Sequence, residues 1–204
     1  MKFFNQQKQN NKLIKNVTFF GGAEVINTSA PDELYDDVIY MAEEIAKLGV
    51  GVVNGGGPGV MRASTEGAKK ANGFVTGVTL QFVDNVSHKF EGQDSLNKFD
   101  KEVKTTNYFD RTKKLLDLGD VHIVIKGGTG TFSEFAMAWE VAYLHYGHNK
   151  PLILYGSQWN NFLESLGNAF MLRHDEYRVY KVIEKKEDVI EYIKSLEGVS
   201  KMWQ

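Results

Sequence analysis

Short apolar segments alternate with helical patterns along most of this chain, and this alternation constrains the fold more than any other sequence feature. Apolar runs without polar alternation are typical of parallel strands that are buried on both faces. Helical spacing between such strands is typical of βαβ units, whose helices cover both faces of one sheet. The sequence therefore predicts an α/β protein with a doubly wound parallel sheet.

The pattern predicts six strands and six helices. The expected strands lie within 17–20, 50–54, 74–80, 121–126, 152–156 and 177–184. The expected helices lie within 29–49, 60–73, 107–119, 132–147, 159–174 and 186–198. Ser29 and Asp32 have capping-box spacing at the first helix, with Pro31 in its first turn. The polar stretch 81–104 has no clear period and is expected to be a long loop.

Length and composition bound the domain organisation. The chain has 204 residues, which suits a single domain, here assigned to 17–204. Residues 1–16 are rich in Asn, Gln and Lys and are expected to form a flexible tail without a signal-peptide pattern. No apolar run approaches the roughly 20 residues that span a bilayer, so no membrane partner is expected. The chain has no cysteine, which excludes thiolate metal sites and fits a reducing, cytoplasmic compartment.

The charge balance bears on partners. Lys and Arg number 24 against 26 Asp and Glu, which gives a formal net charge of −2. A protein that binds nucleic acid usually carries a basic excess. The composition therefore argues against a nucleic-acid partner.

Three glycine-rich turns follow predicted strands, at 21–23, 55–59 and 127–131. In an open parallel sheet, ligands bind outside the carboxyl ends of the strands, where the strand order reverses. Glycine lets the backbone approach a ligand closely, and a helix start offers free N–H groups and a positive dipole end. Together these features favour a phosphate site. The simpler alternative is that each glycine serves only the sterics of a strand-to-helix turn. None of the turns is a Walker A sequence or a dinucleotide fingerprint, so no cofactor is expected.

Two charged residues complete the pattern. Glu134 lies near the start of the helix after the third turn, where a carboxylate is stabilised by the helix dipole. Arg111 lies in the helix before the fourth strand. Each has an ordinary explanation when taken alone, the first as a helix-start acid and the second as a solvated surface charge.

The motifs together resemble those of the LONELY GUY (LOG) family. The segment GGGPGVMRA at 55–63 is similar to the first glycine motif of that family, and KGGTGTFSE at 126–134 is similar to its second. The spacing of Arg111 and Glu134 matches the family's catalytic pair. The resemblance extends over about 17–193.

The resemblance implies a Rossmann-like homodimer that hydrolyses nucleoside 5′-monophosphates, such as AMP or cytokinin ribotides, to free base and ribose 5-phosphate. It implies that Arg111 and Glu134 are the catalytic pair, and no metal is expected. Because cleavage of an N-glycosidic bond builds positive charge on the sugar, our hypothesis is that Glu134 stabilises that charge and acts on the attacking water. It also implies two sets of substrate-binding residues. The first set is Gly55, Gly56, Gly57 and Gly59, and the second is Gly127, Gly128, Thr129, Gly130 and Thr131. Relatives labelled lysine decarboxylases have no support in this sequence, because no lysine stands in a pyridoxal-phosphate context.

The chain departs from the family pattern at two places. Lys126 replaces the proline before the second motif, where its charge could assist phosphate binding or point to solvent. The segment NYFDRTK at 107–113 lacks the family's histidine and the lysine that follows the arginine. These changes bear on substrate preference.

Two other function classes use the same fold. A nucleotide sensor or cofactor carrier would need the glycine turns but not the Arg111–Glu134 pair. A single-strand DNA-binding protein of DNA uptake would need a basic surface, which the charge balance does not favour.

Overall fold

The computed structural model of the protein describes residues 14–23, 33–81 and 94–196. Within these ranges the chain forms seven strands, six α-helices and one 3₁₀ helix. The strands are β1 (Asn16–Phe20), β2 (Gly51–Asn54), β3 (Val75–Leu80), β4 (Lys101–Thr105), β5 (Val121–Val124), β6 (Leu152–Tyr155) and β7 (Tyr180–Ile183). The helices are α1 (Glu33–Lys47), α2 (Val60–Lys70), α3 (Tyr108–Leu118), α4 (Thr129–Leu144), α5 (Gln158–Ala169), η1 (His174–Arg178) and α6 (Lys186–Ser195).

The strands form one parallel sheet in the order β4-β3-β2-β1-β5-β6-β7. The chain adds β2, β3 and β4 outward from β1 and then returns to pair β5 with the other edge of β1. Val17 of β1 therefore lies between Val52 of β2 and Val121 of β5. The strand order reverses between β1 and β5, which is the place where such sheets bind ligands.

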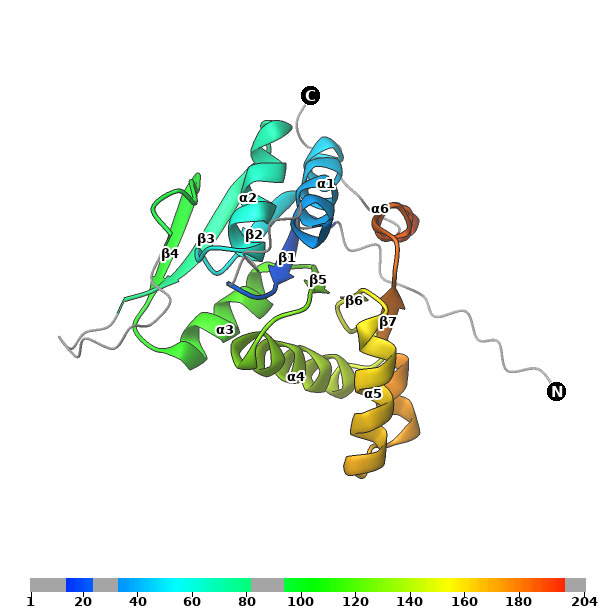
Figure 1. Cartoon of the computed structure of the whole chain (residues 1–204). Coiled ribbons are helices and arrows are strands. Elements are labelled where there is room, and N and C mark those ends of the chain that lie inside the picture. Colours follow the sequence, from blue (N-terminus) through cyan, green and yellow to red (C-terminus); the bar gives the residue numbers. More distant parts are fainter. Residues whose placement is uncertain (1–13, 24–32, 82–93, 197–204) are drawn as a thin grey trace.

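Helices cover both faces of the sheet (Figure 1). On one face α1, α2 and α6 pack with inward residues of the strands, such as Phe19 and Ile123, in one apolar core. On the other face α3, α4 and α5 pack in a second core, which includes Phe135 and Trp139. The expected single-domain, doubly wound parallel sheet is confirmed.

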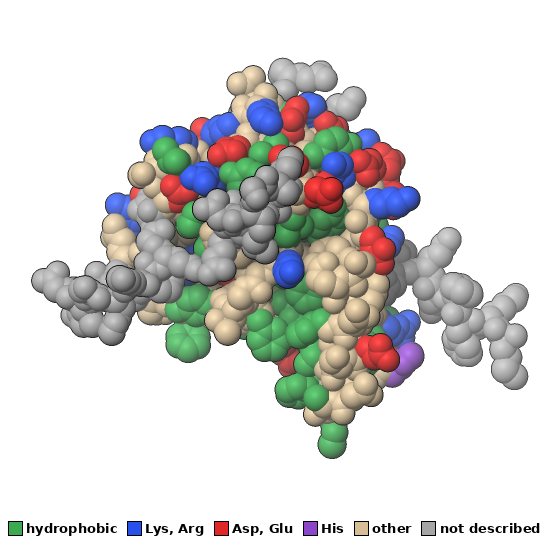
Figure 2. Space-filling view, in the orientation of Figure 1, with side chains coloured by type: hydrophobic (Ala, Val, Ile, Leu, Met, Phe, Trp, Pro, Cys, Tyr) green, Lys and Arg blue, Asp and Glu red, His purple; other side chains and the backbone are tan. Residues whose placement is uncertain are grey.

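The second face leaves apolar side chains exposed. In Figure 2 they gather over α4 and the end of α5, beneath the sheet. The exposed members are Phe132, Val141 and Leu144 on α4, and Phe170 and Met171 directly after α5.

Strand β4 was not predicted, and the assignment of 81–104 to a loop is wrong at its end. Lys101–Thr105 pair in parallel with Thr76–Leu80. This strand lies at the sheet edge, and its charged residues Lys101, Glu102 and Lys104 are all exposed. An edge strand with so little burial has no apolar pattern by which the sequence could reveal it.

Two helix boundaries also differ from the prediction. Helix α4 begins at Thr129 instead of 132, so the end of the third glycine turn is helical. Helix α5 ends at Ala169, and η1 occupies the chain before β7. Tertiary packing sets such ends more strongly than residue propensity does.

The ordered fold begins before Val17. Ile14 is buried, and the backbone N–H groups of Lys15 and Asn16 donate to a carboxylate oxygen of Asp120, at 2.9 and 3.2 Å. The rest of the expected tail, the proposed cap at 29–32 and half of the expected loop, 82–93, lie outside the described residues. No helix in the described ranges has the length and apolar character to cross a membrane.

Candidate functional site

Gly22 joins the glycine turns at the carboxyl edge of the sheet. Its N–H donates to the carbonyl of Lys126 at 3.1 Å, and its own carbonyl accepts from the N–H of Val60 at 3.0 Å. The turns after β1, β2 and β5 therefore meet at the point where the strand order reverses. The sequence indicated the turn at 21–23, but Gly22 was not among the predicted binding residues.

Close backbone contact explains two of the glycines. A Cβ atom at Gly59 would lie 2.4 Å from the carbonyl oxygen of Gly22, and Gly59 has a φ of +64°. A Cβ atom at Gly127 would lie 2.6 Å from the nitrogen of Gly22. Only glycine allows these turns to touch. Gly59 and Gly127 are therefore explained by the packing of the turns against each other, without any contact to a ligand.

The amino end of α4 is open to solvent. Gly128 is the N-cap residue and provides no side-chain cap, and residues 126–130 are exposed. Thr131 is buried in the first helical turn. The first N–H groups of a helix have no partner within the helix and carry the positive end of its dipole. This end of α4 is therefore suited to an anionic group.

Arg111 and Glu134 are brought together, from α3 and α4. Arg111 Nη1 lies 3.5 Å from Glu134 Oε1, and both side chains are about nine-tenths buried. Arg111 Nε donates to the carbonyl of Val78 at 3.1 Å, and Nη2 donates to the carbonyl of Gly55 at 3.0 Å. Partners on β3, on α4 and in the turn after β2 thus fix the guanidinium group.

Gly55 makes room for this arginine. A Cβ atom at Gly55 would lie 1.8 Å from Arg111 Nη2. The first glycine motif therefore contacts Arg111, one member of the predicted catalytic pair. Gly56 and Gly57 continue the turn, and Gly56 has a φ of +79°.

Burial changes the acidity of Glu134. Removal from water raises the pKa of this carboxyl to about 7, and the nearby Arg111 guanidinium opposes part of the rise. A carboxyl with such a pKa exchanges its proton near neutral pH, which suits a general acid or base. Strongly shifted groups of this kind are concentrated at functional sites.

Two further side chains contact the site and were not predicted. The hydroxyl of Tyr108 donates to the carbonyl of Gly130 at 3.0 Å, which links α3 to the first turn of α4. Met61 Sδ lies 3.7 Å from Arg111 Nη2. Tyr108 could have been found from its position three residues before Arg111, because that spacing places both on one helix face.

Lys126 lies exposed at the mouth of the third turn. Its ammonium group has no hydrogen-bond or ion-pair partner within residues 14–23, 33–81 and 94–196. In the same ranges no cluster of three His, Cys, Asp or Glu side chains could hold a metal ion.

These features define a class of protein: a doubly wound α/β domain with an uncapped helix end at the carboxyl edge of its sheet and a buried Arg–Glu pair beside it. The chain belongs to the SLOG cluster4 family, whose model matches residues 15–184.

Two curated relatives are similar over part of their length. A protein of Archaeoglobus fulgidus is 32% identical over 108 residues, which are 52% of this chain and 65% of that protein. A cytokinin riboside 5′-monophosphate phosphoribohydrolase of Mycobacterium tuberculosis is 29% identical over 131 residues, which are 64% of this chain and 66% of that enzyme. The matches thus span just under two thirds of these relatives.

Solved structures share the fold. The structural-genomics protein TM1055 is 26% identical with a TM-score of 0.66, covering 89% of this chain and 99% of that one. A molybdenum cofactor binding protein of Rippkaea orientalis is 24% identical with a TM-score of 0.62, covering 91% and 97%. DNA processing protein A of Helicobacter pylori is 16% identical with a TM-score of 0.60, covering 90% and 82%. The last two likenesses show the fold alone.

Proposed function

We propose that this protein hydrolyses the N-glycosidic bond of a nucleoside 5′-monophosphate. The observation that carries the proposal is the buried Arg111–Glu134 pair beside the uncapped amino end of α4. The relative from M. tuberculosis, named as a phosphoribohydrolase, and the resemblance to the LOG family support this reaction. The base is not assigned, and AMP or a modified adenine ribotide is the starting candidate.

The proposed substrate lies across the reversal point of the sheet. Its 5′-phosphate meets the N–H groups of Gly128, Thr129 and Gly130 and the positive end of the α4 dipole. Lys126 adds a point charge at the same mouth. The turn at 55–59 lines the side of the nucleotide that faces Arg111.

The reaction breaks the bond between C1′ and the base nitrogen and joins a water oxygen to C1′. Positive charge builds on the sugar in the transition state of such cleavage. The Glu134 carboxylate stabilises that charge and accepts a proton from the attacking water, while the leaving base gains a proton. Arg111 is always charged, so it holds the substrate or the departing base by hydrogen bonds.

The decisive experiment measures free base and ribose 5-phosphate after incubation with a panel of nucleoside monophosphates, including AMP and isopentenyl-adenosine monophosphate. In Glu134→Gln we expect base release to fall by about 10²–10³, as when one preorganised electrostatic group is removed, with nucleotide binding retained. Glu140→Gln, an exposed position on the same helix, is the matched control and should behave as the wild type. Equal turnover by Glu134→Gln and wild type would reject the role of Glu134.

The second candidate function is that of a cofactor or nucleotide carrier. It is suggested by the fold that this chain shares with a molybdenum cofactor binding protein. A carrier needs the open helix end but no buried carboxyl of raised pKa. Binding of nucleotide by the wild type without any release of base would support the carrier and reject the hydrolase.

A further inference from the structure

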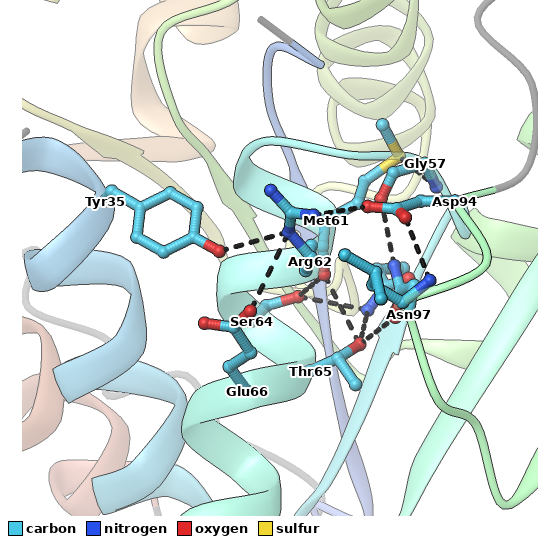
Figure 3. A network of polar contacts seen from close by, with 11 residues as sticks. Tyr35, Gly57, Met61, Arg62, Ser64, Thr65, Glu66, Asp94 and Asn97 are labelled. Carbon is cyan, nitrogen blue, oxygen red and sulfur yellow. Dashed lines mark hydrogen bonds and ion pairs between the residues drawn. The ribbon is translucent and has the colours of Figure 1, made fainter. Parts of the chain in front are cut away.

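A set of buried polar side chains lies beneath the first glycine turn (Figure 3). We call Asn54, Ser64, Thr65 and Asn97 the amide–hydroxyl network. Asn54 Nδ2 donates to Ser64 Oγ at 3.0 Å and to Thr65 Oγ1 at 2.9 Å, and Thr65 Oγ1 lies 2.5 Å from Asn97 Oδ1. All four residues are at most 5% exposed. Buried polar groups in such a network are costly unless each finds its partner.

The network fixes the direction of each hydrogen bond. Thr65 Oγ1 accepts a hydrogen bond from the Asn54 amide, and its hydroxyl donates to the side-chain carbonyl oxygen of Asn97, which is nearer than the Met61 carbonyl at 3.3 Å. The NH₂ group of Asn97 is thereby turned to the carbonyl of Gly57, at 2.9 Å. Asn54 Oδ1 accepts from the N–H of Gly56, also at 2.9 Å. The network therefore grips the glycine turn through both amide side chains.

Three successive carbonyls of the turn are each held by a different donor. Asn97 holds Gly57, the backbone N–H of Asp94 holds Gly56 at 3.0 Å, and Arg111 Nη2 bonds Gly55 at 3.0 Å. The same short turn thus joins the network at one end to Arg111 at the other. The guanidinium group is planar and rigid, so a shift at Nη2 also moves Nη1, which faces Glu134.

An outer brace supports this segment from α1 and α2. Arg62 pairs with the Asp94 carboxylate at 3.1 Å and lies 3.4 Å from the hydroxyl of Tyr35 (Figure 3). Asp94 and Asn97 both come from the stretch that the sequence predicted as a loop. Their contacts show that the part of this stretch that begins at Asp94 supports the first glycine turn.

We infer that Thr65 and Asn97 are positioning residues: they hold the Gly55–Gly57 turn in the place where the Gly55 carbonyl fixes Arg111 beside Glu134. Neither residue need touch the substrate. The catalytic consequence rests on the proposed function, whereas the placement of Arg111 does not.

The test compares Thr65→Val, which keeps the shape but loses the hydroxyl, with Thr65→Ser, which keeps the hydroxyl. Carbon-13 NMR of the Glu134 carboxyl, assigned by its loss in Glu134→Gln, reports the placement of Arg111. In the described residues Arg111 is the charged group that acts on this carboxyl, and it lowers the carboxyl's pKa. Displacing it in Thr65→Val should therefore raise the titration midpoint of Glu134, while Thr65→Ser should retain the wild-type midpoint.

Turnover gives a second readout. Misplacement of a catalytic group lowers the rate steeply, so kcat for the substrate should fall at least about tenfold in Thr65→Val. Thr65→Ser should restore kcat.

Thr18→Val is the matched control. It removes another buried threonine hydroxyl, which donates to the carbonyl of Leu115, and it should destabilise the fold without moving the Glu134 midpoint. If Thr65→Val does not fold, Asn97→Ala removes the same connection between Thr65 and the carbonyl of Gly57. Asn97 lies in no helix or strand, so its replacement should disturb the fold less. A wild-type midpoint in whichever of these variants folds would overturn the inference. The titration of Glu134 needs no turnover, so it tests the inference even if the wild type releases no base. Absence of base release would reject the proposed hydrolase activity but not the role of Thr65 and Asn97.

Discussion

Glu134 lowers the stability of the fold at neutral pH because its ionised form has little contact with water. In the unfolded chain a glutamate releases its proton near its ordinary pKa of 4.5, whereas the folded protein holds that proton up to a pH of about 7. Stability from this group is therefore fully present below pH 4.5 and is lost as the pH rises to about 7. The loss is on the order of 3 kcal/mol.

Glu134→Gln should remove this pH dependence, because glutamine resembles the protonated acid and does not titrate. In urea unfolding, the free energy of unfolding of the variant relative to wild type should rise by about 2 kcal/mol between pH 5 and pH 8. Glu140→Gln should follow the wild-type curve. Parallel curves for wild type and Glu134→Gln would contradict the buried, high-pKa carboxyl.

The residues of the site were only partly predictable from sequence. Arg111 and Glu134 are 23 positions apart, and nothing in either local pattern shows that they meet. The resemblance paired them, but the burial that raises the pKa of Glu134 depends on packing from several elements. Gly22, Met61 and Asn97 were missed as site residues because their contacts are made with residues remote in sequence or through backbone atoms.

At the scale of elements, β5 carries a buried histidine in the middle of the sheet. Burial lowers the pKa of His122 to about 3, and Lys150 adds a smaller effect in the same direction. The unfolded chain takes up a proton below pH 6.5, whereas the folded protein resists it until about pH 3. The contribution of neutral His122 to the free energy of unfolding is therefore fully present above pH 6.5 and is lost as the pH falls toward 3.

His122→Leu should lessen acid sensitivity, since its apolar side chain cannot be protonated. Between pH 7 and pH 4.5 the variant should lose roughly 2 kcal/mol less stability than wild type in chemical unfolding. His148→Gln, at an exposed position, is the control and should keep the wild-type slope. An unchanged slope in His122→Leu would show that another group governs acid unfolding.

Central elements were easier to predict than edges. Strands β1, β2, β5 and β6 are buried on both faces, and their continuous apolar runs gave correct assignments. Strand β4 has a neighbour on one side only, so its side chains need not be apolar. The same reason explains why the sequence predicted six strands where the structure has seven.

At the scale of the molecule, we expect a homodimer that forms through the apolar face of α4 and α5 seen in Figure 2. Leu144 is 66% exposed and Val141 42%, on a helix that also exposes Phe132. Contiguous exposed apolar surface of this kind is typical of protein interfaces. Leu144→Lys combined with Val141→Lys should give a monomer in light scattering coupled to gel filtration. Lys70→Glu, on a helix across the sheet, should leave the mass unchanged, and a monomeric wild type would contradict the expectation.

The overall architecture followed from the alternation of strand and helix patterns, because helices between buried strands leave few other arrangements. The order of strands does not follow from periodicity. It depends on which side of β1 each later strand joins, and local sequence carries little information about that choice.

That order has a consequence for how the chain acquires its structure. Strands β1, β2 and β3 each pair with the next strand along the chain, whereas β1 pairs with β5 only after roughly one hundred intervening residues. Closing so long a loop has an entropic cost that local pairings avoid, so the β1–β5 contact should form late in folding. On the ribosome, the half that holds the first glycine motif emerges before Glu134 has been synthesised. The two halves of the site are therefore made at different times, and a partly synthesised chain has a glycine turn but no acid to act beside it.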